Sequence, residues 1–412
     1  MRSLWFAATM LAALPSSAVA LAAQARAPCG AIARHVDGAG GPGPGAPLFL
    51  LSYEPGPGET RLPGPLATTA FSYDNALAIT ALVACGDVAR ARRIGDAFVD
   101  AARNDRTFDD GRIRNAYRAG PVGPGPVLLP GWWDHTRRAW SEDAYQDGSQ
   151  TGNVAWVALA LLTLEQATHE PRYLETARSL AAWIANNTRE TNGVGGFSGG
   201  VAGFDKKQVT LTWRSTEHNV DVHALGTRLQ SMAPGPMSDI LAQQSKTFLD
   251  AMFDARAGMF RLGTLPDGAR QPTDKMALDA LLWPLIGVQP PPAAWHKSLD
   301  FAVHYLATDG GFDFNGSHGG IWTEGTAQAS LVMRAEGETK AAERLLSAAL
   351  QQASPSGYLY ATDSDKLATG LAVGPDSKGN DFFYYRRPHL GATAWAALAA
   401  NDFNPFTGSR VY

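Results

Sequence analysis

The sequence has little of what several classes of protein depend on. Two cysteines in 412 residues exclude a cysteine-rich zinc protein and a small fold held by several disulfides. Charged residues make up only 18% of the chain, the formal net charge is −4, and no basic stretch stands out, so nucleic acid is not an expected ligand. The hydrophobic fraction of 45% is still enough for a large core, which excludes a disordered chain.

The first 27 residues are expected to lie outside the fold as a signal peptide. Arg2 precedes an apolar run over Leu4–Leu14, and small residues follow at 18–20 and 25–27, which is the three-part pattern of a cleavable secretory signal. The run is shorter than the about 18 residues of a membrane-spanning helix, and no other run reaches that length, so no stable membrane span is expected. With an Ala-, Gly- and Arg-rich composition typical of bacteria, the sequence predicts a secreted or periplasmic bacterial protein. An uncleaved anchor is the alternative.

Export would bring the two cysteines into an oxidising compartment. A disulfide between Cys29 and Cys85 would then tie the mature N-terminus to the first long helix. Two independent buried thiols are the alternative.

Helical spacing of apolar residues recurs along the chain in pairs of segments. The first member of each pair is Ala-rich and apolar nearly all round, which predicts burial on both sides, whereas the second is amphipathic and should face water. The pairs are 72–85 with 88–102, 151–167 with 172–185, 215–232 with 238–253, 273–286 with 293–307, and 323–335 with 339–353. A last strong helix over 388–401 would be partnered by the stretch around 31–35 or by the chain end.

This recurring hairpin predicts an all-α (α/α)6 toroid with an inner and an outer ring of helices. We expect one domain over 28–412, in which residues 28–70 form an N-terminal arm. An open helical solenoid is the competing architecture, but irregular spacing and long links between the pairs fit it less well. Those long links all lead into the first helices of the pairs. One mouth of the toroid should therefore be rich in loops and should carry the functional site.

Four strings of residues resemble a known superfamily. They are Ser215-Thr216-Glu217-His218-Asn219, Thr323-Glu324-Gly325-Thr326-Ala327-Gln328, His389-Leu390-Gly391-Ala392-Thr393-Ala394-Trp395 and Asn404-Pro405-Phe406. Together with the paired helices, they resemble the six-hairpin glycosidases, and within that superfamily an exported and mostly uncharacterised bacterial branch. The resemblance spans roughly Phe71–Phe406. It implies the toroid fold and a carbohydrate-active enzyme, but it carries no established catalytic pair onto these positions.

Acids at the starts of the inner helices indicate the chemistry. Glycoside hydrolysis needs one carboxyl group to protonate the leaving oxygen and a second to act as base or nucleophile. The candidates are Glu217 as general acid, Asp74 or Glu324 as second carboxylate, Asp221 one turn below Glu217, and Asp143 or Asp147 as loop alternatives. The competing interpretation is structural, because a threonine followed by an acid is also an ordinary helix start.

Flat rings and polar side chains near these acids are candidates for holding a sugar. The candidate substrate-binding residues are Tyr73, Trp132, Trp133, Asp143, Trp213, His218, Trp322, Arg386 and His389. Packing at the mouth is the alternative role for the aromatic rings. Arg386, Arg387 and Lys275 could hold an acidic sugar or neutralise the neighbouring acids. The spacing of histidines fits no zinc motif, and neither a metal nor a cofactor is expected.

The sequence therefore favours a glycoside hydrolase acting on a polysaccharide or oligosaccharide. Two alternatives stay open. A polysaccharide lyase of the same fold would use a Tyr or His base, such as Tyr73 or His389, with Arg386 neutralising charge. A non-catalytic periplasmic glycan-binding or assembly protein would have kept the fold and lost the chemistry. The sequence leaves the glycan, the stereochemistry and the oligomeric state undetermined.

Overall fold

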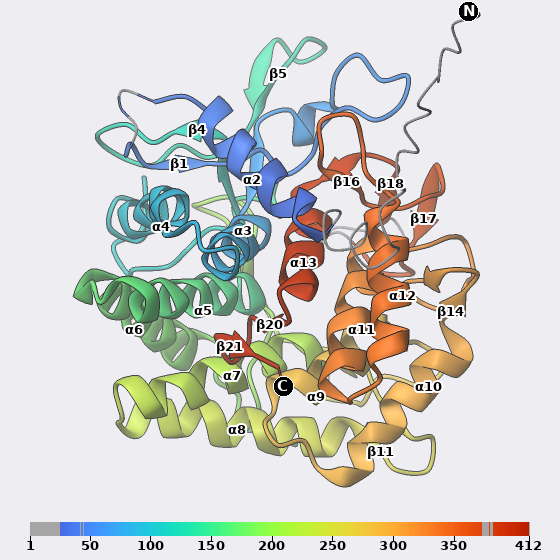
Figure 1. The fold of residues 1–412 in the computed structure, drawn as a ribbon. Helices are drawn as coiled ribbons and strands as arrows, with labels where there is room; N and C mark the ends of the chain where they lie inside the picture. The colour runs from blue at the N-terminus through green and yellow to red at the C-terminus, as the bar shows by residue number, and fades with distance from the viewer. Residues whose placement is uncertain (1–24, 42, 44, 373–378, 380–381, 412) are drawn as a thin grey trace, which may run out of the picture.

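The computed structural model describes residues 25–41, 43, 45–372, 379 and 382–411. Residues 1–24, which hold most of the predicted signal peptide, lie outside the described residues. Long helices dominate the described part, and its β-structure consists of two- and three-stranded pieces only (Figure 1). The predicted all-α class is confirmed.

Six helices form an inner ring. Most of these helices carry alanine and leucine on every side. Nearly all their residues are therefore buried. They are α3 (Ser72–Ala84), α5 (Thr151–Thr168), α7 (Thr216–Met232), α9 (Leu278–Gly287), α11 (Thr323–Ala335) and α13 (Leu390–Ala400). Each packs against the next, and α13 packs against α3 (Figure 1). This last contact closes the ring, which makes the architecture a toroid and excludes an open solenoid.

The outer helices are amphipathic, as their sequences predict. They are α4 (Val88–Arg103), α6 (Pro171–Asn187), α8 (Pro236–Met252), α10 (Lys297–Tyr305), preceded by the 3₁₀ turn η2 (Ala293–His296), and α12 (Thr339–Leu350). Proline in the first turn starts α6 and α8, where a missing N–H costs nothing, and the Asp87 side chain caps α4 by accepting the N–H of Arg90. Their apolar faces cover the inner ring.

The sixth outer helix is α2 (Ala27–Gly38), which packs against both α13 and α3 (Figure 1). Of the two partners predicted for the last inner helix, the N-terminal stretch is the right one. A disulfide joins Cys29 of α2 to Cys85 at the end of α3. The expected pairing of the two cysteines is therefore present, and it fixes the first helix on the ring.

The largest difference from the predicted helix boundaries is at the start of the fourth inner helix. We expected the fourth inner helix to begin at Thr273, but α9 begins at Leu278. The N–H of Leu278 donates to the carbonyl of Phe314 at 2.9 Å, and Ala277 is extended, so the helix cannot continue toward Thr273. Lys275 lies in the preceding loop, where it is exposed.

Short strands join the long links to the helix starts. Of these, β2, β7, β10 and β19 each run directly into an inner helix, and each pairs with a strand from a long link. The strands and the remaining 3₁₀ turn are β1 (Leu48–Phe49), η1 (Gly64–Leu66), β2 (Thr69–Phe71), β3 (Ala116–Arg118), β4 (Gly120–Pro121), β5 (Trp132–Asp134), β6 (Ala139–Ser141), β7 (Ser149–Gln150), β8 (Gly200–Ala202), β9 (Val209–Leu211), β10 (Arg214–Ser215), β11 (Phe253–Asp254), β12 (Met259–Phe260), β13 (Gly263–Thr264), β14 (Ala307–Thr308), β15 (Gly311–Phe312), β16 (Leu359–Tyr360), β17 (Lys366–Ala368), β18 (Phe383–Tyr385), β19 (Pro388–His389), β20 (Phe403–Asn404) and β21 (Ser409–Arg410). The loops of the mouth are thus anchored beside the helix N-termini.

The centre of the ring is filled by aromatic rings. Trp156, Trp283 and Trp395 are each the sixth residue of their helix, so they lie at one level below the helix starts. Phe406, from the turn between β20 and β21, packs against Trp156 and Trp283 at centroid distances of 4.9 and 5.5 Å. The toroid is therefore closed below this layer. In the described ranges, no helix combines the length and the apolar character needed to cross a bilayer.

Candidate active site

Four acids lie in the first turn of inner helices, all at the loop-rich end of the ring. Glu217, Asp279 and Glu324 are each the second residue of their helix, and Asp74 is the third residue of α3. The positive end of the helix dipole favours an acid at such a position. Because the ring is closed, the fold brings these acids to one place above the aromatic layer.

The tightest cluster joins Asp74, Glu324 and His389, which are 2%, 3% and 3% exposed. Nε2 of His389 lies 3.3 Å from Oδ1 of Asp74, and Nδ1 lies 3.8 Å from Oε2 of Glu324. Nδ1 also accepts the N–H of Ala392 and so caps α13, while the imidazole stacks on Tyr53 at 4.3 Å. Burial lowers the pKa of His389, but the two carboxylates outweigh burial and leave this pKa raised. His389 therefore lies between the two acids, and their proximity favours its protonated form.

A glycine lets these two acids approach each other. A Cβ atom at Gly391 would stand 2.7 Å from Oδ1 of Asp74 and 3.1 Å from Oε2 of Glu324, so a larger residue would collide with both. Because both oxygens lie about 3 Å from one point, they are at most about 6 Å apart, within the range where like charges disfavour ionisation. In the described structure, Oδ2 of Asp74 and Oε2 of Glu324 are buried without a hydrogen-bond partner. These oxygens therefore keep an unused capacity to accept a hydrogen bond.

Tyr73 connects Glu324 to the aromatic layer. Its O–H donates to Oε1 of Glu324 at 2.6 Å and accepts the indole N–H of Trp395 at 2.8 Å. Burial raises the pKa of Glu324 to about 7, although His389 and Tyr73 oppose the shift. The Tyr73 hydrogen bond thus holds one carboxylate oxygen in place while the other stays free.

Glu217 is the most exposed of the mouth acids, being half-buried where the others are buried. Burial raises the pKa of Glu217 well above its usual value, and the neighbouring acids Asp279 and Glu324 raise it further. Burial also raises the pKa of Asp279 to about 6. A carboxyl group that stays protonated near neutral pH, next to groups that ionise more readily, is suited to donate a proton.

Asp221 and His218 lie behind Glu217 on α7. Asp221 is fully buried, neither of its oxygens has a hydrogen-bond partner among the described residues, and burial raises its pKa well above normal. Burial lowers the pKa of His218 to about 4, so this ring is neutral. Gly152 leaves room for both side chains, since a Cβ atom there would stand 2.9 Å from Nε2 of His218 and 3.1 Å from Oδ2 of Asp221. Both predicted residues therefore lie beside Glu217 and below the mouth.

The predicted aromatic platforms differ in exposure. Trp213 is half-buried, and its ring lies against His218 at a centroid distance of 5.4 Å. Trp132 is half-buried, and its ring packs against Gly64 of η1. Trp133 is 52% exposed, and it pairs across the β5–β6 hairpin with Trp140, which is 47% exposed. Trp213 therefore accompanies the acids, and Trp133 faces solvent on a hairpin.

Trp322 needs a correction. We predicted a ring that could hold a sugar, but Trp322 is only 1% exposed. It packs between Phe314 and Tyr384, at centroid distances of 4.8 and 5.7 Å, because the Trp322 side chain turns back over Gly325 and into the wall. Its contribution is to support Tyr384, the half-buried ring whose pKa is raised by burial and then by Glu324.

The two loop acids, Asp143 and Asp147, form contacts within the loops. Oδ1 of Asp143 accepts the N–H groups of Tyr145 and Gln146, which forms a turn. Asp147 is fully buried in an ion-pair network with Arg106, which also binds Glu142 and Asp205. The neighbouring ion pairs of this network join Arg114 to Asp105 and Asp205 at 2.5 and 2.6 Å. The arrangement favours a structural role for Asp143 and Asp147 over the catalytic one that we considered.

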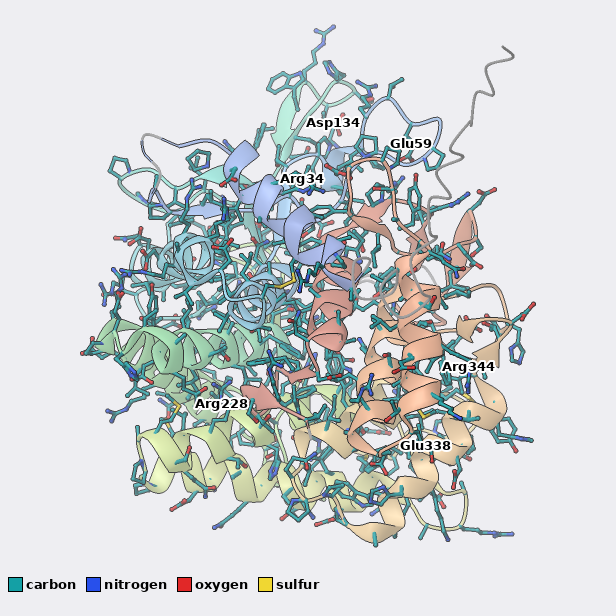
Figure 2. The ribbon with its side chains drawn as sticks, viewed as in Figure 1. Arg34, Glu59, Asp134, Arg228, Glu338 and Arg344 are labelled. Carbon is teal, nitrogen blue, oxygen red and sulfur yellow. A yellow bond between two sulfur atoms is a disulfide. The ribbon has the colours of Figure 1, made fainter. Side chains whose placement is uncertain are left out.

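The predicted basic residues are engaged or point outward. Arg387 forms two hydrogen bonds to Glu59, at 2.9 and 2.6 Å, and this contact lowers the pKa of Glu59 to about 2. Arg386 is exposed, and its guanidinium lies 5.0 Å from the ring of Tyr360. Figure 2 labels Glu59 in the loops at the same end of the molecule as Asp134. Arg387 thus neutralises a neighbouring acid, which was one of its two predicted roles.

Two cavities of about 520 and 400 Å³ lie away from the acids. The first lies beside α2 and is lined by Arg34, His35 and Tyr358, among others. The second lies among loops near Asp309 and Asp363. The acid cluster borders neither, and the partial exposure of Glu217, Tyr73 and Trp213 marks the side from which the cluster meets solvent.

Sequence reasoning left Asp279 outside the set of candidate residues. The reason is the misplaced start of α9, which put Asp279 one turn inside the helix. With the helix starts aligned as the structure has them, Asp279 occupies the same second position as Glu217 and Glu324. Tyr53 and Tyr384 were also missed, because they come from a loop and from β18, whose sequences carry no sign that they reach the acids.

Comparison with solved structures shows the fold. A glycosidase variant in complex with glucose superposes with a TM-score of 0.63 at 16% identity, covering 95% of this chain and 99% of that chain. A possible member of glycoside hydrolase family 105 from Salmonella enterica gives a TM-score of 0.59 at 13% identity, covering 92% and 93%. A family 76 α-mannanase from Bacteroides thetaiotaomicron gives 0.51 at 12%, covering 81% and 88%. Neither the family models nor the curated proteins gave a match. The chain therefore has the toroid fold of these glycosidases, as the resemblance implied.

Proposed function

We propose that this protein is a glycoside hydrolase. The observation that carries the proposal is the convergence of Asp74, Glu217, Asp279 and Glu324 on one end of a closed ring, where the described structure leaves carboxylate oxygens without partners. A purely structural role would pair such acids with cations or backbone donors. The similarity to solved glycosidases supports the same reaction class.

Glu217 acts as the general acid in this proposal. Burial, together with Asp279 and Glu324, raises its pKa, which favours the protonated form that can protonate the leaving oxygen. Glu324 acts as the second carboxylate, because Tyr73 fixes one of its oxygens and the other is free. The proximity of His389 favours the ionised form of Glu324, and Asp74 in turn holds the imidazole. Asp74, paired with His389, is then a positioning residue.

The solved relatives add independent support for two glutamates and a tyrosine. The similar glycosidase is represented by separate variants with alanine in place of two different glutamates, one of them in complex with glucose, and by a variant with phenylalanine in place of a tyrosine. We propose that Glu217, Glu324 and Tyr73 supply the same kinds of group in this chain.

Elimination by a lyase is supported less well. A lyase needs a cation to neutralise the carboxylate of a uronic acid, and Arg386 faces solvent while Arg387 is bound to Glu59. A non-catalytic role would leave four converging acids without a purpose. Both alternatives are distinguished by the products, since hydrolysis yields new reducing ends, elimination yields an unsaturated ring, and a binding protein yields neither.

The test compares Glu217→Gln with the wild-type protein on a panel of oligosaccharides and aryl glycosides. We expect turnover to fall about 10²–10⁴-fold, the usual contribution of a general acid, with the free energy of unfolding within about 1 kcal/mol of wild type. Glu338→Gln, on the exposed start of α12 (Figure 2), is the matched control and should keep full activity. A fully active Glu217→Gln protein would remove Glu217 from the mechanism.

We also propose that the protein is exported, as its N-terminal sequence pattern predicts. The Cys29–Cys85 disulfide supports this, because structural disulfides persist mainly in oxidising compartments. Fractionation of cells that express the full chain, with N-terminal sequencing of the product, tests it. A cytosolic protein that begins at Met1 would contradict the proposal.

A further inference from the structure

We propose that the sugar ring bound among the mouth acids carries no negative charge, so that the substrate is a neutral glycan and a uronic acid is excluded at this position. The inference rests on the proposed function and concerns the same site. It rests on separate observations, namely the balance of charge around the acids and the contacts that already engage the buried Arg387 and Arg214.

The acids face one another more than they face cations. Among the described residues, the ionisable groups that raise the pKa of Glu217 and Asp221 are other carboxyl groups of the cluster. Glu324 has one basic neighbour, His389, which it shares with Asp74. A further carboxylate brought here by a ligand would meet the same repulsion, in surroundings that screen it poorly.

Two buried guanidinium groups near the mouth are already engaged by other groups of the protein. Arg387 already forms a two-pronged contact with Glu59, which is the geometry that would otherwise recognise a uronate. Arg214 donates to the carbonyl oxygens of Asn192 and Gly195 and to the hydroxyl of Thr264. These contacts hold the loop that precedes α7.

What the site does offer suits a ring that carries hydroxyl groups. Oδ2 of Asp74 and Oε2 of Glu324 are nearly buried and have no partner in the described structure, so each can accept a hydrogen bond from a sugar hydroxyl. The protonated carboxyl of Glu217 can donate one. The half-buried ring of Trp213 supplies an apolar surface beside them.

The experiment uses pairs of 4-nitrophenyl glycosides that differ only at C6, glucoside against glucuronide and galactoside against galacturonide, in both anomers. We expect kcat/KM for the neutral member of the cleaved pair to exceed that of the uronide by at least about 100-fold. Asp279→Asn removes one negative charge without changing shape and should narrow this ratio about tenfold. Glu338→Gln, far from the site, should leave the ratio unchanged.

A binding measurement separates this inference from the proposed reaction. Calorimetric titration of Glu217→Gln with the neutral monosaccharides and with the corresponding uronates should show binding of a neutral sugar alone. Neutral binding without any cleavage by the wild-type protein would refute the hydrolase and support the charge inference. Cleavage of a uronide as fast as its neutral counterpart would overturn the inference and leave the hydrolase intact. Failure of every neutral sugar to be bound or cleaved would also overturn it.

Discussion

Two groups of acids in this protein differ in the basic side chains that surround them. In the loop network, Asp105 and Asp205 flank Arg114, while Glu142 and Asp147 meet Arg106. At the mouth, Asp74 and Glu324 share His389, and Glu217 and Asp279 form no ion pair with another described residue. The arginines of the network lower the pKa of Asp105 and Asp205 even though burial opposes them. Burial raises the pKa of Glu217, Asp279 and Glu324 at the mouth, and within the network it raises that of Asp147 to about 7.

This difference distinguishes acids that stabilise the fold from acids that we propose to contact a ligand. A buried carboxylate without a partner reduces stability, so its retention needs another reason. Both groups lie in long loops or at helix starts, and composition alone does not tell them apart. What distinguishes them is the nearest cation, which only the folded chain reveals.

The largest effect on stability is expected in the network. Arg114→Met leaves Asp105 and Asp205 without the guanidinium that binds both, and Arg114 is fully buried. We expect a loss of about 3–5 kcal/mol in the free energy of unfolding, the usual cost of breaking a buried ion pair. Urea denaturation measures it. Arg344→Met on the exposed face of α12 (Figure 2) is the control and should change stability by less than about 0.5 kcal/mol. Equal losses of unfolding free energy in the two variants would show that the acids of the network do not stabilise the fold through Arg114.

A smaller effect is expected in how stability depends on pH. Burial raises the pKa of Glu324 from 4.5 to about 7 and that of Asp279 from 3.8 to about 6. Between the lower and the upper value of each group, the folded protein holds more protons than the unfolded chain. The free energy of unfolding therefore falls as the pH rises from about 4 to about 7.

Urea denaturation at pH 5 and pH 7.5 tests this with the double variant Glu324→Gln and Asp279→Asn. The variant should lose less stability than wild type between the two pH values, because its two amides do not titrate. Glu338→Gln should follow wild type. Parallel curves for the double variant and wild type would show that the mouth acids have ordinary pKa values.

The smallest effect concerns the link between the mouth and the aromatic layer. Tyr73→Phe removes the hydroxyl that donates to Glu324 and accepts from Trp395. Because both partners are left unpaired, we expect the free energy of unfolding to fall by about 1–3 kcal/mol. The lost hydrogen bond also lowered the pKa of Glu324, so that pKa should rise and shift the acidic limb of the pH–rate profile to higher pH. An unshifted profile with reduced stability would restrict Tyr73 to packing.

The fold could be predicted from the sequence because its signal is periodic. Helices such as α5 and α13 are apolar all round, and only burial between two layers explains that pattern. The pairing of α2 with α13 was one of two alternatives, since a short amphipathic segment does not indicate its partner. The start of α9 was misplaced because the carbonyl of Phe314, distant in sequence, takes the N–H of Leu278.

The site could be predicted in part. Glu217 and Glu324 were identified because each follows a threonine at a helix start, and the structure brings them to one end of the ring. The roles of Trp322 and Asp147 depend on which side chains surround them, Tyr384 in one case and Arg106 in the other, and both partners come from other segments. Sequence spacing holds no information about such contacts. The catalytic assignment itself stays a prediction.

The contact of α2 with α13 bears on how the chain is made. Synthesis proceeds from the N-terminus, so the helix at Ala27–Gly38 leaves the ribosome long before the helix at Leu390–Ala400, against which it packs. Until that late helix emerges, α3 and α11 each keep an apolar side without a neighbour. The nascent chain thus cannot complete the ring before the helix at Leu390–Ala400 has been synthesised. Chaperones would have that whole interval in which to bind the exposed apolar sides.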